Sequence, residues 1–303
     1  MPKSQVSSLL CPTEKISEEQ LITDRNLLAF ERTLQRLNRR SFLSAFASAA
    51  VVGSFGAIAT SSADAQSTAT PSVADVLNFA LNLEYLEVNF YMIAATGSGL
   101  PAAAMGTAPG ALTGSPGKLP LDATTLALAL ALAQDEMNHV MLLRSTISSL
   151  GGTPIDQPAI NLAAKGALTT QAQFLTSARQ LTSLGGSAYA GAAAFLASNP
   201  SVLSTASQIL GAEGQHQGAV NYQCVRQNIV GALDPQIDAI DVPPSASNYF
   251  TVLPTNSLGQ QRTTSQVLGI AYGVSTATTT TATAGTTMGG YFPAGLNGNI
   301  KST

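Results

Sequence analysis

Two Glu-x-x-His motifs place the strongest constraint on how this chain of 303 residues folds. Glu136 is paired with His139, and Glu213 is paired with His216. On a helix, residues three apart lie on one face about one turn apart, so each pair can present a carboxylate and an imidazole to a single point. The chain has only two histidines, and both lie in these motifs. Because only 10% of the residues are charged, this concentration indicates buried chemistry rather than surface decoration.

The hydrophobic pattern of residues 66–231 predicts four helices joined by short connections, with glycine- and proline-rich links at 97–121 and 153–168. Ser72 and Asp122 are the expected N-caps of the first two helices. The four expected spans are Ser72 to Gly97, Asp122 to Gly151, Thr169 or Thr170 to Ala197 with a bend at Gly185 and Gly186, and Ser201 to about Gly231. Four helices of this length favour an all-α four-helix bundle.

Residues 1–65 are predicted to be a leader and export signal rather than part of the fold. The sequence N-R-R-S-F-L at 38–43 resembles a twin-arginine signal, followed by an apolar run at 45–59 and a small-x-small cleavage sequence at 63–65. The resemblance implies that the protein is exported folded by the twin-arginine machinery, to the periplasm or beyond. An uncleaved membrane anchor is the alternative, disfavoured because glycine and serine interrupt a run already short for a span. The long segment before residue 38 leaves open whether the true start codon lies downstream.

From residue 232 to 303 the composition changes to prolines, Asn/Ser pairs and a threonine run, which predicts a mostly irregular extension. Two islands, Q-V-L-G-I-A-Y-G at 266–273 and an aromatic, glycine-rich stretch at 289–300, are expected to pack on the bundle. The threonine run at 276–283 is expected to be a mobile loop. The predicted domains are therefore 1–65, 66–231 and 232–303.

Depth along the helices predicts that the motifs meet. Counted from the N-caps, Glu84, Glu136 and Glu213 lie roughly 18–21 Å along helices of about 40 Å, which is their middle. Carboxylates buried at one level are costly unless they are paired or bound to a cation. A purely structural buried network is the competing interpretation. The predicted metal ligands are Glu84, Glu136, His139, Glu213 and His216, with Glu87 as an additional candidate.

The ligand pattern resembles the ferritin-like di-metal carboxylate bundles, in which the first helix supplies a glutamate and the second and fourth supply Glu-x-x-His. More closely, L-E-Y-L-E at 83–87, A-Y-A-G-A-A at 188–193 and G-G-Y-F-P-A-G-L-N-G at 289–298 resemble the exported, desiccation-related ferritin-like family. This resemblance spans roughly residues 70–300. It implies a ferritin-like metal-binding bundle. The donor set suits iron, manganese or zinc, and the expected cofactor is one or two ions of iron or manganese.

The third helix departs from the di-metal pattern because residues 169–198 contain no aspartate or glutamate. The position at the depth of a fourth carboxylate is about Thr182, and a hydroxyl is a poor substitute. Glu87 and Tyr189 are the candidates to compensate. Otherwise the site is expected to hold one metal, to bind weakly or to have lost its redox chemistry.

Three functions remain open. The first is a ferroxidase- or catalase-like di-iron or dimanganese protein that acts on peroxide, oxygen or ferrous iron in oxidative or desiccation stress. The second is a non-catalytic, stress-protective scaffold, and the third, ranked last, is a storage cage. A net charge of −3 gives no reason to expect nucleic acid as a partner. Metal ions and the export machinery are the expected partners, and a homo-oligomer is left open. Cys224 is expected to be an apolar helix residue.

Overall fold

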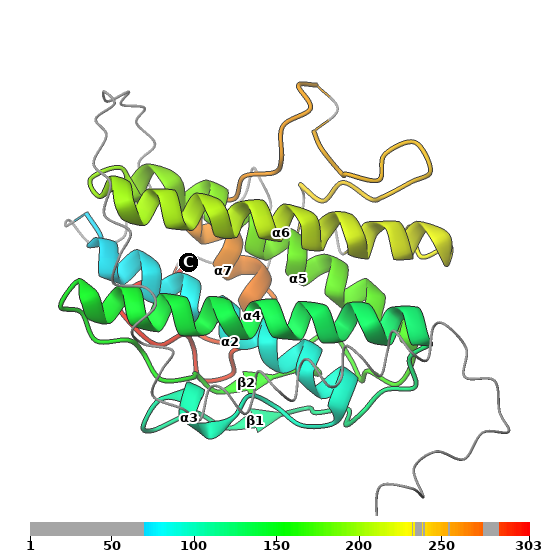
Figure 1. Ribbon diagram of the computed structural model, residues 1–303, viewed down its shortest axis with the longest axis horizontal. Helices are drawn as coiled ribbons and strands as arrows, with labels where there is room; N and C mark the ends of the chain where they lie inside the picture. Colours follow the sequence, from blue (N-terminus) through cyan, green and yellow to red (C-terminus); the bar gives the residue numbers. More distant parts are fainter. Residues whose placement is uncertain (1–69, 232, 234–237, 239, 254, 275–284) are drawn as a thin grey trace, which may run out of the picture.

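The computed structural model describes residues 70–303, except for 232, 234–237, 239, 254 and 275–284. The predicted leader and twin-arginine signal at 1–65 and the threonine run at 276–283 lie outside the described residues. Within them the fold is all-α, as predicted. Four long helices form the bundle: α2 (Val73–Thr96), α4 (Ala123–Ser149), α5 (Gln171–Ala192) and α6 (Pro200–Arg226). Helix α2 packs mainly on α4, and α5 packs mainly on α6 (Figure 1).

Side-chain caps begin each of these helices. Ser72 and Asp75 form a capping box at the start of α2, and left-handed Gly97, with φ 85°, ends that helix. Asp122 caps α4 by accepting from the Thr125 N–H at 2.7 Å. Thr170 caps α5 and Asn199 caps α6 in the same way. Both ends of α2 and the start of α4 are therefore where the sequence predicts them.

The third helix differs from its prediction at its end. Helix α5 is continuous through Gly185 and Gly186 and stops at Ala192. A single 3-10 turn, η2 (Ala193–Leu196), then leads to Pro200, the first residue of α6. Proline suits a first helical position because its missing N–H would have no partner there. The predicted end at Ala197 therefore included a turn that is not α-helical.

Helix α2 is buried along most of its length, and almost all of its side chains from Val76 to Ala95 are buried. A helix buried on every side needs cover from more than two neighbours. The C-terminal segment supplies part of it: the Asn82 amide donates to the Asn297 carbonyl at 3.0 Å and accepts from the Asn297 N–H at 2.9 Å. The core around α2 thus includes residues from the far end of the sequence.

The connections between the long helices contain three short elements. Helix α3 (Ala102–Met105) and strand β1 (Leu112–Thr113) lie between α2 and α4, and strand β2 (Ile160–Asn161) lies between α4 and α5. The two strands pair in parallel over two residues. These segments were expected to be loops, and the strands are too short to alter the fold class.

The C-terminal extension is partly helical. The island at 266–273 lies largely in helix α7 (Thr264–Tyr272), which packs on α5, and the second island buries Tyr291 and Phe292 in the core. Arg262 connects this region to α5 by a hydrogen bond to the Ser187 hydroxyl at 2.6 Å. Its other partner, Asp238, lies within the extension and forms a buried ion pair with it at 2.6 Å.

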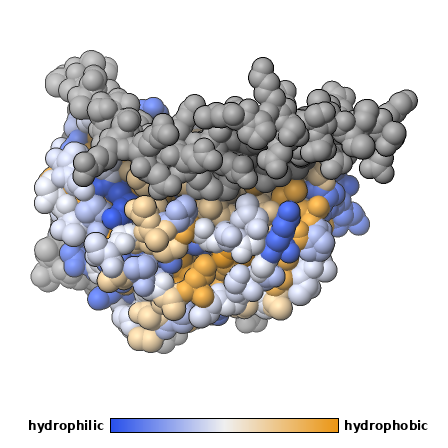
Figure 2. All heavy atoms as spheres, turned by 60° about the horizontal axis from the view of Figure 1, so that its bottom comes forward, coloured by the Kyte–Doolittle hydropathy of each residue, from blue (hydrophilic) through white to orange (hydrophobic). Residues whose placement is uncertain are grey.

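No described helix combines the length and apolar character needed to cross a membrane. The face shown in Figure 2 carries apolar side chains among polar ones. Phe250 is the most exposed large hydrophobic side chain among the described residues, at 75%.

Candidate metal centre

Three helices bring the predicted ligands together inside the bundle. Each contributes two side chains one turn apart, as the Glu-x-x-His spacing and the L-E-Y-L-E sequence require. The six side chains are Glu84 and Glu87 from α2, Glu136 and His139 from α4, and Glu213 and His216 from α6, and all six are buried. Burial of four carboxylates in a sparsely charged protein is costly without compensating charge.

His139 lies at the centre of one group of carboxylates. Its Nδ1 is 2.9 Å from Glu136 Oε2, 3.4 Å from Glu84 Oε2 and 3.5 Å from Glu213 Oε1. A ligating atom from each of these four residues can be chosen so that all lie within 4.8 Å of one another. Donor atoms on opposite sides of one ion bound at about 2.1 Å are about 4.2 Å apart. A small inward movement would therefore bring this group around a single cation.

His216 lies beside the same acids from the other Glu-x-x-His motif. Its Nδ1 is 3.0 Å from Glu136 Oε1 and 3.6 Å from Glu213 Oε1. Its other nitrogen, Nε2, is 3.1 Å from Asp135 Oδ2, and the Asp135 side chain is 53% exposed. Asp135 thus orients the ring from the solvent side, as a carboxylate commonly does behind a metal-binding imidazole.

Helix α5 contributes no carboxylate, and it meets the site through Tyr189, a predicted candidate, and through Gly185, which the sequence did not indicate. The Tyr189 hydroxyl donates to Glu84 Oε1 at 2.5 Å. Thr182, the residue predicted to lie at the position of the missing fourth carboxylate, donates its hydroxyl within its own helix, to the Ala178 carbonyl at 3.1 Å. The residue that faces the acids is Gly185, where a Cβ would lie 2.6 Å from Glu87 Oε1 and 2.9 Å from Glu213 Oε2.

Several buried acceptor atoms of the cluster have no hydrogen-bond partner. Although His216 Nδ1 is only 3.0 Å from Glu136 Oε1, the two atoms are not aligned for a hydrogen bond. The unpartnered atoms of the six side chains are Glu84 Oε2, Glu87 Oε2, Glu136 Oε1, both Glu213 oxygens and His216 Nδ1. Buried polar atoms normally find partners. Carboxylate oxygens and an imidazole nitrogen that lie close together without hydrogen-bond partners are the arrangement expected of a cation-binding site.

The carboxylates are held in different protonation environments. Burial raises the pKa of Glu84 to about 8, although the charge of His139 opposes this. Burial also raises the pKa of Glu87 well above its usual value, and the charges of Glu213 and Glu136 raise it further. Burial would raise the pKa of Glu136 too, but the hydrogen bond from His139 and the charges of His139 and His216 lower it to about 2.

The two imidazoles hold protons strongly when no metal is bound. Burial would lower the pKa of His216, but Asp135, Glu136 and Glu213 raise it to about 12. His139 is also buried, and Glu84, Glu136 and Glu213 raise its pKa above the usual value. Protons therefore substitute for metal charge in the metal-free protein, and a metal ion would displace them.

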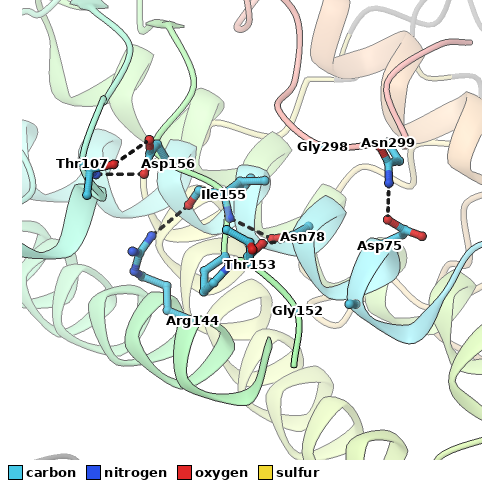
Figure 3. A pocket seen from close by; sticks show the side chains of 12 residues that line it. Asp75, Asn78, Thr107, Arg144, Gly152, Thr153, Ile155, Asp156, Gly298 and Asn299 are labelled. Atoms are coloured by element: carbon cyan, nitrogen blue, oxygen red, sulfur yellow. Dashed lines mark hydrogen bonds between the residues drawn. The ribbon is translucent and has the colours of Figure 1, made fainter. Parts of the chain in front are cut away.

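A surface hollow of about 690 Å³ lies elsewhere, where the start of α2 meets the segment that follows α4 (Figure 3). Its polar side chains are occupied by structural contacts. Asp75 accepts from Asn299, Arg144 donates to the Ile155 carbonyl, and Asp156 accepts from the Thr107 N–H (Figure 3). None of the six clustered glutamate and histidine residues lines this hollow.

Comparison with known families agrees with the geometry. A family model described as a ferritin-like domain matches residues 72–225. This span begins at the N-cap of α2 and ends one residue before the end of α6, so it contains the four long helices and all six clustered residues. A comparison with curated proteins finds no match.

Proposed function

Because the chain belongs to the ferritin-like family, we propose that it binds iron or manganese at the buried carboxylate and histidine cluster. The observation that carries this proposal is the group of Glu84, Glu136, His139 and Glu213, whose ligating atoms lie within 4.8 Å of one another. Carboxylate oxygens with imidazole nitrogens suit these metals better than soft copper(I), which prefers sulfur ligands. The unpartnered acceptor atoms in the same place favour a cation over a purely structural network.

Bound iron or manganese would supply redox chemistry toward peroxide, oxygen or ferrous iron. The protein's own residues would set the conditions for it. Tyr189 holds Glu84 in place from α5, and Asp135 holds the His216 ring through Nε2. The surrounding core excludes bulk water, because the Glu136 side chain is 0% exposed and that of Glu213 is 1% exposed. Uptake of the metal requires the imidazoles to release their protons, so binding should be tighter at higher pH.

The experiment that tests metal binding is elemental analysis of the purified protein beside the double variant Glu136→Ala/Glu213→Ala. Iron or manganese present in the wild type and lost in the variant would support the proposal. Absence of metal from both, even after incubation with Fe²⁺ or Mn²⁺, would contradict it. Peroxide consumption and ferrous iron oxidation would then be measured on the loaded protein, with the same double variant as the control.

A place outside the cytoplasm, with a role in oxidative or desiccation stress, is part of this proposal. It rests on the twin-arginine sequence at residues 38–43 and on the resemblance to exported ferritin-like proteins. Replacing Arg39 and Arg40 by lysine should leave the protein in the cytoplasm of a twin-arginine-competent host. Normal export of that variant would contradict the twin-arginine route.

A non-catalytic scaffold is the second candidate, and the lack of an aspartate or glutamate on α5 favours it. In that case the metal would stabilise the bundle or be absent. The discriminating measurement compares turnover with stability. A loaded protein that melts at a higher temperature but consumes neither peroxide nor ferrous iron would be a scaffold.

A further inference from the structure

The four-residue group around His139 leaves part of the cluster unused. Glu87 and His216 are outside that group. The atoms they offer, Glu87 Oε2 and His216 Nδ1, are buried and have no hydrogen-bond partner. The side chains of Glu136 and Glu213 each bring a second oxygen, and Glu136 Oε1 and Glu213 Oε2 also have no partner. Buried donor atoms outside the four-residue group therefore remain next to Glu136 and Glu213: His216 Nδ1 is 3.0 Å from Glu136 Oε1, and Glu87 and Glu213 both lie close to the same position over Gly185.

Gly185 explains how Glu87 reaches this part of the cluster. A Cβ at that position would lie 2.6 Å from Glu87 Oε1 and 2.9 Å from Glu213 Oε2, closer than non-bonded atoms approach. The two carboxylates thus occupy the space that any side chain at position 185 would need. Helix α5 brings no acid of its own, and its glycine makes room for one from α2.

Charge balance favours two cations over one. Four buried carboxylates carry a charge of −4 when all are ionised. Two divalent cations with two neutral imidazoles would neutralise them, whereas one divalent cation would leave two of the four dependent on bound protons for neutrality, as in the metal-free protein. Uncompensated buried charge is strongly unfavourable. Carboxylates that bridge two ions about 3.5–4 Å apart are a common solution.

We propose that Glu87, extending over Gly185, is the carboxylate ligand of a second cation position completed by Glu136, Glu213 and His216. Glu136 and Glu213 are shared with the first position, and Gly185 contributes by having no side chain in the space that the Glu87 and Glu213 carboxylates occupy. This inference rests on the proposed function, because the second position adjoins the first. It assigns to α2 the ligand that α5 lacks.

The test counts Mn²⁺ ions bound by the full-length, metal-stripped protein in equilibrium dialysis, and records the electron paramagnetic resonance spectrum of the loaded protein. The wild type should bind about two ions that are magnetically coupled, as expected for bridged ions about 3.5–4 Å apart. Glu87→Gln keeps the side-chain size and should bind about one, with the uncoupled spectrum of an isolated ion. Circular dichroism of the stripped variant checks that it is folded.

A pair of glycine variants separates the role of Gly185 from helix stability. Gly185→Ala should displace Glu87 and reduce Mn²⁺ binding toward about one ion. Gly186→Ala is the matched control, because its Cβ would meet only the Glu213 Cβ, at an ordinary 3.5 Å. It should bind as the wild type does. Both variants replace glycine by alanine in the same helix, so the change in helix propensity is shared.

The outcomes distinguish this inference from the proposed function. Binding of a single ion by both the wild type and Glu87→Gln would overturn the second position and leave metal binding intact. Two ions bound by Glu87→Gln would likewise overturn the role of Glu87. Failure of the wild type to bind Mn²⁺ or Fe²⁺ at all would contradict the proposed function itself.

Discussion

The Tyr189 hydroxyl donates a hydrogen bond to Glu84 Oε1 at 2.5 Å and so joins α5 to α2 at the level of the metal cluster. Both side chains are buried. Burial, together with the neighbouring Glu84, raises the pKa of Tyr189 well above its usual value, so the hydroxyl keeps its proton and remains a donor. A helix without a carboxylate therefore still holds one of the predicted ligands.

Tyr189→Phe should weaken both stability and metal binding. The variant keeps the ring but leaves Glu84 Oε1 without its donor, which costs about 1–3 kcal/mol in the free energy of unfolding of the metal-free protein. Loss of an orienting partner of a ligand should lower Mn²⁺ affinity by about 10–100-fold. Urea denaturation and Mn²⁺ titration measure the two effects.

Tyr91→Phe is the matched control for that variant. Tyr91 is also a buried tyrosine near the cluster, but its hydroxyl has no hydrogen-bond partner. Removing this hydroxyl should not destabilise the protein, because no bond is lost. Equal losses in both variants would show that the Tyr189 hydrogen bond has no special role.

The metal-free protein should lose stability as the pH rises from 6.5 to 8. The folded-state pKa of His216 is raised from 6.5 to about 12. Its contribution to the free energy of unfolding is therefore complete below pH 6.5 and is lost as the pH rises toward 12. The pKa of Glu84 is raised from 4.5 to about 8, so its contribution to stability is lost as the pH rises between those two values. The pKa of Glu136 is lowered from 4.5 to about 2, so its contribution to stability is lost only as the pH falls through that range.

Metal should reverse this trend. Bound metal requires neutral imidazoles, so a rising pH favours the loaded form. Thermal melts of stripped and Mn²⁺-saturated protein at pH 6.5 and pH 8 test both expectations. A stripped protein whose melting temperature rises over this interval would contradict the assigned protonation states.

Metal removal should lower the melting temperature of the wild type but not that of Glu213→Ala. A ligand present at about 100 times its dissociation constant stabilises the native state by about 2.7 kcal/mol. Glu213 contacts both imidazoles, at 3.5 Å and 3.6 Å, so its removal should abolish the effect. Differential scanning calorimetry with and without Mn²⁺ measures it, and an equal shift in the variant would place the metal elsewhere.

Arg262→Met should destabilise the protein by about 3–5 kcal/mol, because it leaves Asp238 buried without its partner. The two side chains form a 2.6 Å ion pair and are 1% and 3% exposed. Arg226→Met is the control, since Arg226 is exposed and lies 5.8 Å from the Tyr222 ring centroid, an interaction of about 0.5–1 kcal/mol. Urea denaturation compares them, and similar losses would show that the buried pair contributes little.

The sequence was sufficient to predict the bundle because its signals are local. Ser72 and Asp122 mark helix starts through their own side chains, and Gly97 marks an end through its left-handed backbone. The Glu-x-x-His spacing fixes which two side chains share a helix face. These signals predicted an all-α fold and brought the candidate ligands to one level.

Tyr189 was a candidate from its position on α5, but the contribution of Gly185 could not be predicted in the same way. Counting residues from the N-cap gives the distance along a helix but not the direction in which a side chain points around it. The count therefore selected Thr182 rather than Gly185, which lies about one turn further along. Glycine was interpreted by its effect on its own backbone. Its effect here is on Glu87 and Glu213, which come from other helices. That relationship exists only after the helices have packed.

The pair of hydrogen bonds between Asn82 and Asn297 has a consequence for the order of folding. It joins residues 215 positions apart, so α2, which is synthesised before the other three long helices of the bundle, receives part of its cover from a segment that is synthesised after all of them. Contacts of such long separation form late and slow the folding of a chain. Until residue 297 is available, the buried face of α2 that meets it stays open to water and to other chains. A nascent or C-terminally shortened chain would therefore be most vulnerable to aggregation and proteolysis at α2.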